Sequence, residues 1–457
     1  MKLNDTITAI STPSGEGGIG IVRISGVKAI NIIQKIFKPH KRDNFIPRTH
    51  TISYGMIINP ETKESIDEVL VSIMLAPFSY TKEDVAEINC HGGIIPLNRI
   101  LKLVILMGAR LAEPGEFTKR AFLNGRIDLA QAEAVIDVIR AKTEKSLREA
   151  QYQLEGRISN EISYLRDILI DFLSRLELSV DFIEEDIEIV SYQEIHKSLV
   201  HILDKIEKLL KSVSMGKIIK EGIKIAIVGR PNVGKSSLLN SLLNEDRAIV
   251  TNFPGTTRDC LEEILEINGI PAVIIDTAGI RKTGDEIEQA GIERTRRCIK
   301  RADIVLLLFD ISEPFHEEDL NMINEIKDKK VIFVLNKIDK KNIMKTDNLP
   351  ALIPQIKISV LNDIDIDKLK NVIYNLIALK HIDTKEEVLI NNLRHEEALK
   401  SANISLNRAL LGIQNKLSPE FIAQDVKEAA FYLGSIIGKT YTEDILNNIF
   451  SNFCIGK

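Results

Sequence analysis

Residues 229–236 have the sequence Gly229-Arg230-Pro231-Asn232-Val233-Gly234-Lys235-Ser236, which matches the G-x-x-x-x-G-K-[ST] pattern of a phosphate-binding loop. The apolar residues 223–228 before it predict a buried strand, and residues 237–243 after it predict a helix. A glycine-rich turn from strand to helix directs backbone N–H groups toward an anion at the positive end of the helix dipole. Lys235 is placed to reach the β- and γ-phosphates, and Ser236 to offer its hydroxyl to Mg²⁺. The loop therefore predicts a nucleotide-binding protein.

The composition is typical of a soluble globular protein. The 457 residues are 44% hydrophobic and 27% charged, and this length is enough for about three domains. The sequence has no apolar run of about eighteen residues and no signal-peptide core, so we expect a cytoplasmic protein that does not bind a membrane. The net charge of −5 means that a nucleic acid would have to bind a local basic patch. The four cysteines are too scattered for a disulfide framework or a C-x-x-C metal site: Cys90, Cys260, Cys298 and Cys454.

The N-terminal region is predicted to be an α+β domain. Residues 19–25 and 69–75 have the apolar character of strands. Residues 15–20 match the dinucleotide pattern G-x-G-x-x-G, but that pattern must follow a strand and open a helix. Here it precedes a predicted strand, so we do not interpret it as a dinucleotide site.

Helical periodicity dominates on both sides of the phosphate-binding region. Apolar residues recur in steps of three and four from Leu147 to Leu176, which predicts one long amphipathic helix. A second helix is predicted around residues 195–209, and residues 386–450 are predicted to be helical again. We therefore expect a nucleotide-binding domain inserted into a helical domain. The predicted division is an N-terminal domain over 1–118, a helical domain in two parts over 119–216 and 381–457, and a Ras-like P-loop G domain over 217–380.

The predicted G domain carries further nucleotide-binding motifs at the ends of its strands. Predicted strands end in Asp276-Thr277-Ala278-Gly279 and in Asn336-Lys337-Ile338-Asp339, and in a parallel α/β sheet these ends meet at the ligand. Asp276 is expected in the Mg²⁺ shell, and the Gly279 N–H can sense the γ-phosphate. Asp339 can accept two hydrogen bonds from guanine, and adenine would leave this carboxylate unpaired. The motifs together predict a GTPase and not an ATPase.

The group that positions the attacking water stays open at this stage. Gly279 is followed by Ile280, which cannot replace the glutamine of Ras-like GTPases. The same loop carries several polar residues, among them Arg281, Asp285, Glu286 and Glu288, and any of these carboxylates is a candidate. Asn232 offers an amide oxygen beside the phosphates, where a monovalent cation could supply the charge of an arginine finger.

Motifs from one end of the chain to the other resemble the MnmE family of tRNA modification GTPases. The resemblance runs from Asp5 to Lys457. Its motifs are residues 230–240, Gly255-Thr256-Thr257-Arg258-Asp259, residues 276–281, Pro114-Gly115-Glu116-Phe117, residues 121–124 and 128–134, and the final Cys454-Ile455-Gly456-Lys457.

The resemblance implies a function and a set of partners. It implies a homodimer built through N-terminal domains that bind a tetrahydrofolate derivative, either 5-formyl- or methylene-tetrahydrofolate. It implies a GTPase that depends on K⁺ and Mg²⁺ and whose G domains pair face to face during hydrolysis. It implies work with the FAD protein MnmG, in a heterotetramer, on C5 of the wobble uridine of certain tRNAs.

The resemblance also implies site residues by position. The catalytic candidates are Glu288, which would position the water, Arg281, and Cys454. Mg²⁺ would bind Ser236 and Thr257, and K⁺ would bind Asn232, Thr251, Phe253 and Thr256. The folate would contact Arg23, Glu87, Arg126 and Lys457, where Arg126 replaces the lysine of some relatives. The expected GTP contacts are Asn232, Val233, Gly234, Lys235, Ser236, Ser237, Thr251, Asn252, Phe253, Pro254, Gly255, Thr256, Thr257, Asp276, Thr277, Ala278, Gly279, Asn336, Lys337, Asp339, Ser359 and Val360.

A second function remains as an alternative, a ribosome-assembly or RNA-binding GTPase of the Era or Der kind. Such proteins carry a KH domain with a Gly-x-x-Gly loop or a second G domain, and neither stands out in this sequence. Folate binding by the N-terminal region would separate the two hypotheses.

Overall fold

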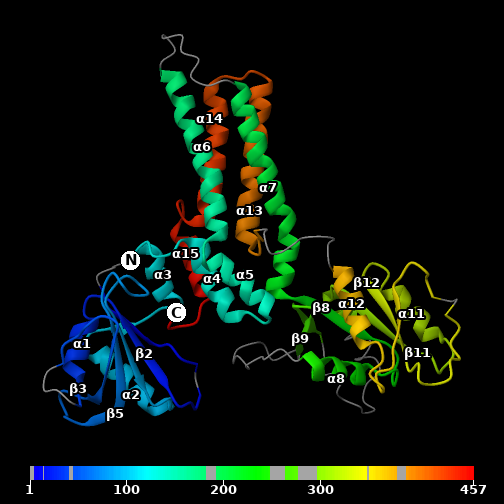
Figure 1. Ribbon diagram of the computed structural model, residues 1–457, viewed down its shortest axis with the longest axis horizontal. Coiled ribbons are helices and arrows are strands. Elements are labelled where there is room, and N and C mark those ends of the chain that lie inside the picture. The colour runs from blue at the N-terminus through cyan, green and yellow to red at the C-terminus, as the bar shows by residue number, and fades with distance from the viewer. Residues whose placement is uncertain are drawn as a thin grey trace. The chain divides into compact units, whose positions relative to one another are not determined.

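The computed structural model describes residues 5–13, 15–40, 45–181, 192–246, 263–275, 296–346, 349–377 and 388–457 (Figure 1). The chain divides into two compact units. The first comprises Met1–Ile136 together with Leu433–Lys457, and the second comprises Asp137–Tyr432. The C-terminal residues thus belong to the same unit as the N-terminal sheet.

The first unit is built on a mostly antiparallel sheet with the strand order β3-β4-β5-β6-β2-β1-β7. The apolar residues of its strands alternate, so that Val22 and Ile24 of β2 pack with Val71 and Ile88 under two helices, α1 and α2. The strands are β1 (Ile7–Ile10), β2 (Gly20–Ser25), β3 (Phe37–Pro39), β4 (Thr51–Ile58), β5 (Ser65–Met74), β6 (Val85–Cys90) and β7 (Arg110–Leu111), and the two helices are α1 (Ala29–Ile36) and α2 (Ile94–Leu106). Because side chains alternate along a strand, Arg23 lies on the opposite face of the sheet.

The opposite face carries the helix α3 (Glu116–Leu123), whose Phe117 packs with Ile7 and Ala9 of β1. The C-terminal helix α15 (Glu443–Ser451) packs against α3 through Phe450, which is buried with Phe122. Gly115 stands at the N-terminus of α3 with φ 66°, and a Cβ there would lie 2.8 Å from the Phe450 carbonyl oxygen. This close approach requires a glycine, and it fixes the C-terminal segment against the N-terminal sheet.

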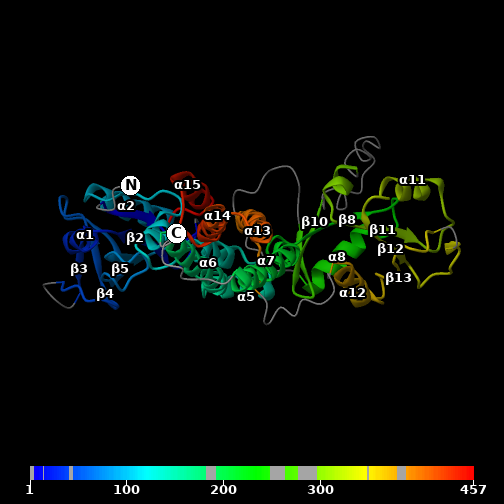
Figure 2. The same cartoon turned by 90° about the horizontal axis from the view of Figure 1, so that it is seen from above.

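The second unit begins as a helical bundle (Figures 1 and 2). Its helices are α4 (Leu129–Arg140), which crosses from the first unit, α5 (Glu144–Leu154), α6 (Arg157–Asp181), α7 (Tyr192–Glu221), α13 (Leu393–Gln414) and most of α14 (Pro419–Ile437). The prediction of one continuous helix from Leu147 to Leu176 is wrong. The chain breaks between α5 and α6 at Gly156, whose φ of 92° no residue of a right-handed helix adopts. The apolar stripe continues from α5 into α6. The periodicity of the sequence therefore gave no sign of the break at Gly156.

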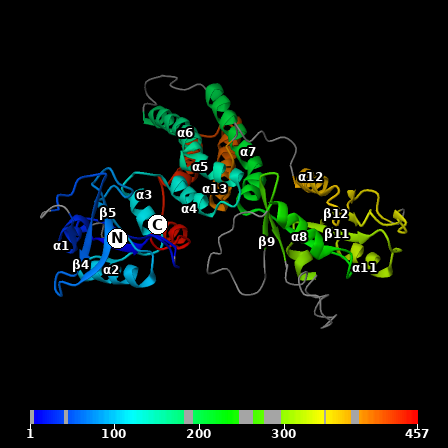
Figure 3. The same cartoon turned by 60° about the horizontal axis from the view of Figure 1, so that its bottom comes forward.

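The bundle continues directly into an α/β domain, since α7 runs up to β8 and packs against β10 (Figure 3). The sheet order is β13-β12-β11-β8-β10-β9, and all neighbours are parallel except the β9–β10 hairpin. Apolar clusters cover both faces of the sheet, as expected for a doubly wound fold. The elements are β8 (Ile223–Val228), α8 (Lys235–Asp246), β9 (Glu263–Ile267), β10 (Ile270–Ile274), β11 (Ile304–Asp310), α11 (Glu317–Glu325), β12 (Lys330–Asn336), β13 (Gln355–Lys357) and α12 (Ile366–Ile377).

The predicted fold class is confirmed: an N-terminal α+β domain, a helical domain and an inserted P-loop domain. β2 begins at Gly20, so the glycine pattern at residues 15–20 does precede a strand. The exact four-part domain boundaries stay a prediction. Within the described residues, no helix combines the length and the apolar character that crossing a membrane requires.

Candidate functional site

The first candidate site is the phosphate-binding loop between β8 and α8. Three of its residues have positive φ, 150° at Gly229, 63° at Asn232 and 106° at Gly234. A Cβ at Gly234 would lie 2.3 Å from Nδ2 of Asn336, and one at Gly229 would lie 2.6 Å from the Leu308 carbonyl oxygen. Both glycines of the motif are therefore required by close packing as well as by backbone conformation.

Lys235 is held inside this loop. Its ammonium donates hydrogen bonds to the carbonyl oxygens of Gly229 at 2.8 Å and Arg230 at 2.6 Å. Burial lowers the pKa of Lys235. A phosphate anion would therefore find a half-buried, positively charged partner at the N-terminus of α8. The predicted position of Lys235 beside the phosphates fits this geometry.

Asn336 connects the phosphate loop to the turn after β13. Its Nδ2 donates to the Val233 carbonyl oxygen at 2.9 Å, and its Oδ1 accepts from the Val360 N–H at 3.2 Å. The side chain is buried, and its hydrogen bonds fix the distance between two segments that are far apart in sequence. In the same turn, Ser359 Oγ donates to Oδ1 of Asp339, a residue that follows β12. The structure thus brings the predicted base-recognition residues next to the loop, from the carboxyl ends of β12 and β13.

Asp310 is a member of this site that the sequence analysis missed. It is buried at the end of β11 and accepts from Lys337 Nζ at 2.5 Å, while Lys337 also donates to the Asn232 carbonyl oxygen at 2.9 Å. Burial acts to raise the pKa of Asp310, but hydrogen bonds from Lys337 and Ser312 hold that pKa below its ordinary value. The available signal was an aspartate directly after the apolar run 304–309, on a strand next to β8.

Many predicted nucleotide and metal ligands lie outside the described residues. These are Thr251, Asn252, Phe253, Pro254, Gly255, Thr256, Thr257, Asp276, Thr277, Ala278, Gly279, Arg281 and Glu288. Their roles stay predictions. Among the residues that are described, no group of three or more His, Cys, Asp and Glu side chains could hold a metal ion.

The second candidate site lies in the first unit, on the sheet face opposite α1 and α2. Arg23 and Glu87 are direct neighbours across β2 and β6, and Arg23 Nε donates to Glu87 Oε1 at 2.8 Å. The same guanidinium donates from a terminal nitrogen to the Gly456 carbonyl oxygen at 3.1 Å. Residues from two strands and from the end of the chain therefore meet at one point.

Lys457 completes this cluster. Burial and the nearby charge of Arg23 hold the pKa of Lys457 below its ordinary value, against the opposing effects of Glu87 and Cys454. Gly456 has φ 98°, and a Cβ there would lie 2.5 Å from the Ile10 carbonyl oxygen. The tail is thus packed closely against β1 at a position that only glycine fits. In this cluster the two side-chain cations, Arg23 and Lys457, outnumber the one side-chain carboxylate, Glu87. Such a cluster suits a ligand with carboxylate or other acceptor groups.

Arg126 joins the cluster through Tyr80, which the sequence analysis also missed. The Arg126 guanidinium lies 4.8 Å from the centroid of the Tyr80 ring, and the Arg23 guanidinium lies 5.9 Å from it. The four predicted folate residues therefore lie in one region of the first unit. An aromatic residue in the loop between β5 and β6 carries no recognisable motif, so no sequence signal pointed to it.

Cys454 is exposed, as expected for an accessible thiol. Its carbonyl oxygen accepts from the N–H groups of Gly115 at 3.4 Å and Lys457 at 3.3 Å, so the backbone at this residue is fixed. The chemical role of the thiol stays a prediction.

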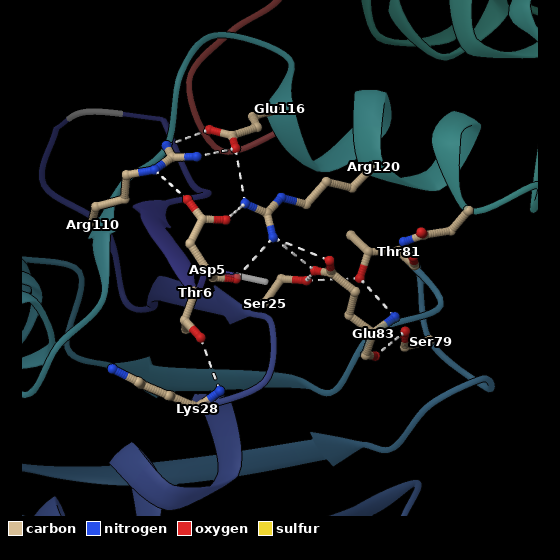
Figure 4. A network of polar contacts seen from close by, with 11 residues as sticks. Asp5, Thr6, Ser25, Lys28, Ser79, Thr81, Glu83, Arg110, Glu116 and Arg120 are labelled. Atoms are coloured by element: carbon tan, nitrogen blue, oxygen red, sulfur yellow. Dashed lines mark hydrogen bonds and ion pairs between the residues drawn. The ribbon is translucent and has the colours of Figure 1, made fainter. Parts of the chain in front are cut away.

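A network of charged side chains around the buried Arg120 lies in the same unit (Figure 4). Arg120 is fully buried and pairs with Asp5 at 2.5 Å, Glu83 at 3.1 Å and Glu116 at 3.0 Å. Arg110 pairs with the same Glu116 and Asp5, each at 2.6 Å. Although burial acts to raise them, the pKa values of Asp5 and Glu116 are held low by hydrogen bonds from Arg120 and Arg110. The network joins β1, β7, α3 and the loop before β6.

Comparisons with known proteins cover the whole chain. Residues 129–454 match the family described as the MnmE helical domain, and residues 6–126 match the one described as the N-terminus of the GTP-binding protein TrmE. The tRNA modification GTPase MnmE of Thermoanaerobacter pseudethanolicus is 49% identical over 99% of both chains. The protein of the same name from Acetivibrio thermocellus is 47% identical over 100% of both chains. A solved structure of an Era variant from Aquifex aeolicus is 29% identical and covers 40% of this chain and 66% of that chain, with a TM-score of 0.28, from which we draw no conclusion.

Proposed function

Because the chain belongs to the MnmE family of tRNA modification GTPases, we propose that it hydrolyses GTP during the modification of tRNA at C5 of the wobble uridine. The observation that carries the proposal is that one chain holds both an intact phosphate loop, in the second unit, and a cluster of cations, in the first. The ribosome-assembly alternative gains no support from relatives that span the whole chain.

The proposed nucleotide is GTP. Asp339 would accept hydrogen bonds from guanine, and Asn336 is already fixed between the loop and the base-recognition turn. A direct test is Asp339→Asn, which should weaken GTP binding far more than binding of a xanthine nucleotide, since an amide no longer accepts both guanine donors. Equal losses for the two nucleotides, measured by titration, would contradict this assignment.

Two metal ions are part of the proposal. Ser236 stands in the first turn of α8 beside Lys235, where its hydroxyl fits a Mg²⁺ ligand, and Thr257 would be a second ligand. Asn232, Thr251, Phe253 and Thr256 would hold K⁺, and Glu288 would position the water. Bound cations would neutralise charge that develops on the phosphates during hydrolysis.

The cluster of Arg23, Glu87, Arg126 and Lys457 is proposed to bind a tetrahydrofolate derivative. A reduced folate has carboxylate, amide and ring acceptor groups, and the cluster combines cations with a single described carboxylate partner, Glu87. The folate would supply a one-carbon unit, and these side chains would bind and orient it. Cys454 and Arg281 are proposed catalytic residues whose contacts with substrate are not assigned.

The proposed partners are a second copy of the chain, an FAD protein of the MnmG kind in a heterotetramer, and tRNA. The proposed location is the cytoplasm. These proposals rest on the family and not on any surface of the two units.

The experiment that tests the proposal measures both ligands on the full chain. We expect wild-type protein to bind 5-formyl-tetrahydrofolate in calorimetry and to hydrolyse GTP. Arg23→Ala should weaken folate binding while GTP turnover is unchanged, and Lys235→Ala should do the reverse. Failure of the wild-type protein to bind any reduced folate would overturn the folate assignment, while GTP turnover without tRNA modification in a complemented strain would overturn the function.

A further inference from the structure

Tyr80 lies where two of the proposed folate ligands meet. Arg23 comes from β2 and Arg126 from the segment after α3, and both guanidinium groups lie over the Tyr80 ring, at 5.9 and 4.8 Å from its centroid. A cation over an aromatic face is attracted by the ring quadrupole within about 6 Å. One ring therefore lies within reach of two cations that come from different elements.

Tyr80 makes hydrogen bonds through both its hydroxyl and its backbone. Its hydroxyl hydrogen-bonds Thr118 Oγ1 at 2.9 Å, and Thr118 is fully buried on α3. The backbone carbonyl oxygen of Tyr80 accepts from Arg126 at 3.3 Å. Burial raises the pKa of Tyr80, although Thr118 and the two arginines act to lower it.

The loop that carries Tyr80 is fixed by contacts of Thr81 and Glu83 with the network around Arg120 (Figure 4). Arg120 pairs with Glu83, and the Asn124 side-chain amide donates to the Thr81 carbonyl oxygen at 2.7 Å. Thr81 is fully buried and hydrogen-bonds the Ser25 hydroxyl at 2.7 Å. The loop directly after Tyr80 is thus held by several hydrogen bonds and an ion pair.

The two arginines differ in how much they depend on the ring. Arg23 is also fixed by Glu87 and by the Gly456 carbonyl oxygen, and it lies 5.6 Å from the centroid of the Phe117 ring. Arg126 is exposed, and both described contacts of its guanidinium, with the ring and with the backbone carbonyl oxygen, are made to Tyr80. An exposed arginine loses much rotamer entropy when a ligand immobilises it, and a pre-formed contact reduces that cost.

We propose that Tyr80 is a positioning residue of the folate site, whose ring holds Arg23 and Arg126 in place for a reduced folate. This inference rests on the proposed folate function. The aromatic face is the part that matters, because the hydroxyl is already used on Thr118. The network around Arg120 and Glu83 sets the position of the ring in turn.

The test is calorimetric binding of 5-formyl-tetrahydrofolate to the full chain and three variants. Tyr80→Leu removes the ring and should weaken folate binding about tenfold, as expected for the loss of two cation–π contacts. Tyr80→Phe keeps the ring and should stay within about threefold of wild type. Tyr152→Leu is the matched control, because Tyr152 contacts the Arg157 guanidinium at 3.5 Å in the second unit and should leave folate binding unchanged.

A double-mutant cycle with Arg126→Ala separates positioning from simple loss of structure. If Tyr80 acts through Arg126, the losses in Tyr80→Leu and Arg126→Ala should be strongly non-additive. Additive losses, equal losses in the Phe and Leu variants, or unchanged binding by Tyr80→Leu would each overturn the inference. No folate binding by wild-type protein would instead overturn the proposed function itself, so the two failures are distinguishable.

Discussion

At the scale of single residues, the nucleotide site depends on side chains that fix one segment to another. Asn336 joins the phosphate loop to the turn after β13 through a donor and an acceptor on one amide. Lys337, with φ 68°, joins the same loop to Asp310 on β11. A substitution at either residue should therefore change the shape of the site as well as its contacts.

Asp310→Asn tests the role of the buried carboxylate. The amide keeps the volume but loses the charge-assisted hydrogen bond from Lys337, so Lys337 should no longer hold the Asn232 segment. We expect nucleotide affinity to fall about tenfold, the size expected for one charged hydrogen bond. Titration with a fluorescent guanine nucleotide measures this, and Asp204→Asn, which removes an exposed ion pair with Lys208 on α7, serves as the control. Wild-type affinity in Asp310→Asn would show that Lys337 is positioned by other contacts.

At the scale of elements, the C-terminal tail is placed by backbone packing. Gly456 has φ 98° and its Cα lies so close to β1 that a Cβ would be 2.5 Å from the Ile10 carbonyl oxygen. Gly456→Ala should therefore displace the tail and, with it, the hydrogen bond to Arg23. We expect folate binding and tRNA modification to be lost while GTP hydrolysis continues.

The measurement for this variant is the modified-nucleoside content of tRNA by mass spectrometry, together with GTP turnover of the purified protein. Gly125→Ala is a useful comparison, because Gly125 also has positive φ, 67°, but nothing lies within 4 Å of a Cβ there. The Gly125→Ala variant should therefore be destabilised by backbone strain alone, without a steric clash. Normal modification by Gly456→Ala would mean that the tail tolerates displacement.

Periodic elements and motif-bearing loops could be predicted from the sequence, and single contacts could not. The strand–loop–helix around Lys235 was predictable because the residues act locally, through glycine conformation and apolar runs. The break at Gly156 was not, because an apolar stripe records which face is buried and not whether the helix is continuous. Asp310 and Tyr80 were missed because their importance comes from partners far away in the sequence.

At the scale of the whole molecule, the first unit should lose stability in acid. Asp5 and Glu116 have pKa values held below the ordinary 3.8 and 4.5, so both carboxylates stabilise the folded first unit when ionised. A lowered folded-state pKa contributes stability that is present above the unfolded-state pKa and is lost as the pH falls through the folded-state pKa. We therefore expect the first unit to lose stability progressively below about pH 4.5.

Hydrogen exchange followed by mass spectrometry measures this for each unit separately. Peptides from β1 and α3 should lose protection as the pH falls, after correction for the intrinsic exchange rate. Glu116→Gln should lower the protection at neutral pH and make it less dependent on pH, since the amide does not titrate. The same pH dependence in wild type and Glu116→Gln would show that other groups dominate.

The last prediction concerns the insertion of the nucleotide-binding domain. The chain leaves the bundle at the end of α7 and returns beside it, because the Ile390 N–H donates to Ser212 Oγ at 3.0 Å. A Cβ at Gly216 would lie 2.2 Å from the Ile390 carbonyl oxygen, so the two segments are in direct backbone contact. Gly216 is only about one and a half helical turns from the end of α7, so a flexible linker of about six residues can replace 223–387.

We expect this excised variant to fold, because the apolar clusters of the inserted sheet are made almost entirely of its own strands and helices. It should bind no guanine nucleotide and should bind 5-formyl-tetrahydrofolate as tightly as the full chain, since the Arg23 cluster belongs to the first unit. Calorimetry with both ligands, and far-UV circular dichroism to confirm the helices, make the comparison. A folded variant that binds no folate would show that the folate site depends on the nucleotide-binding domain, and that the two activities are coupled in binding as well as in turnover.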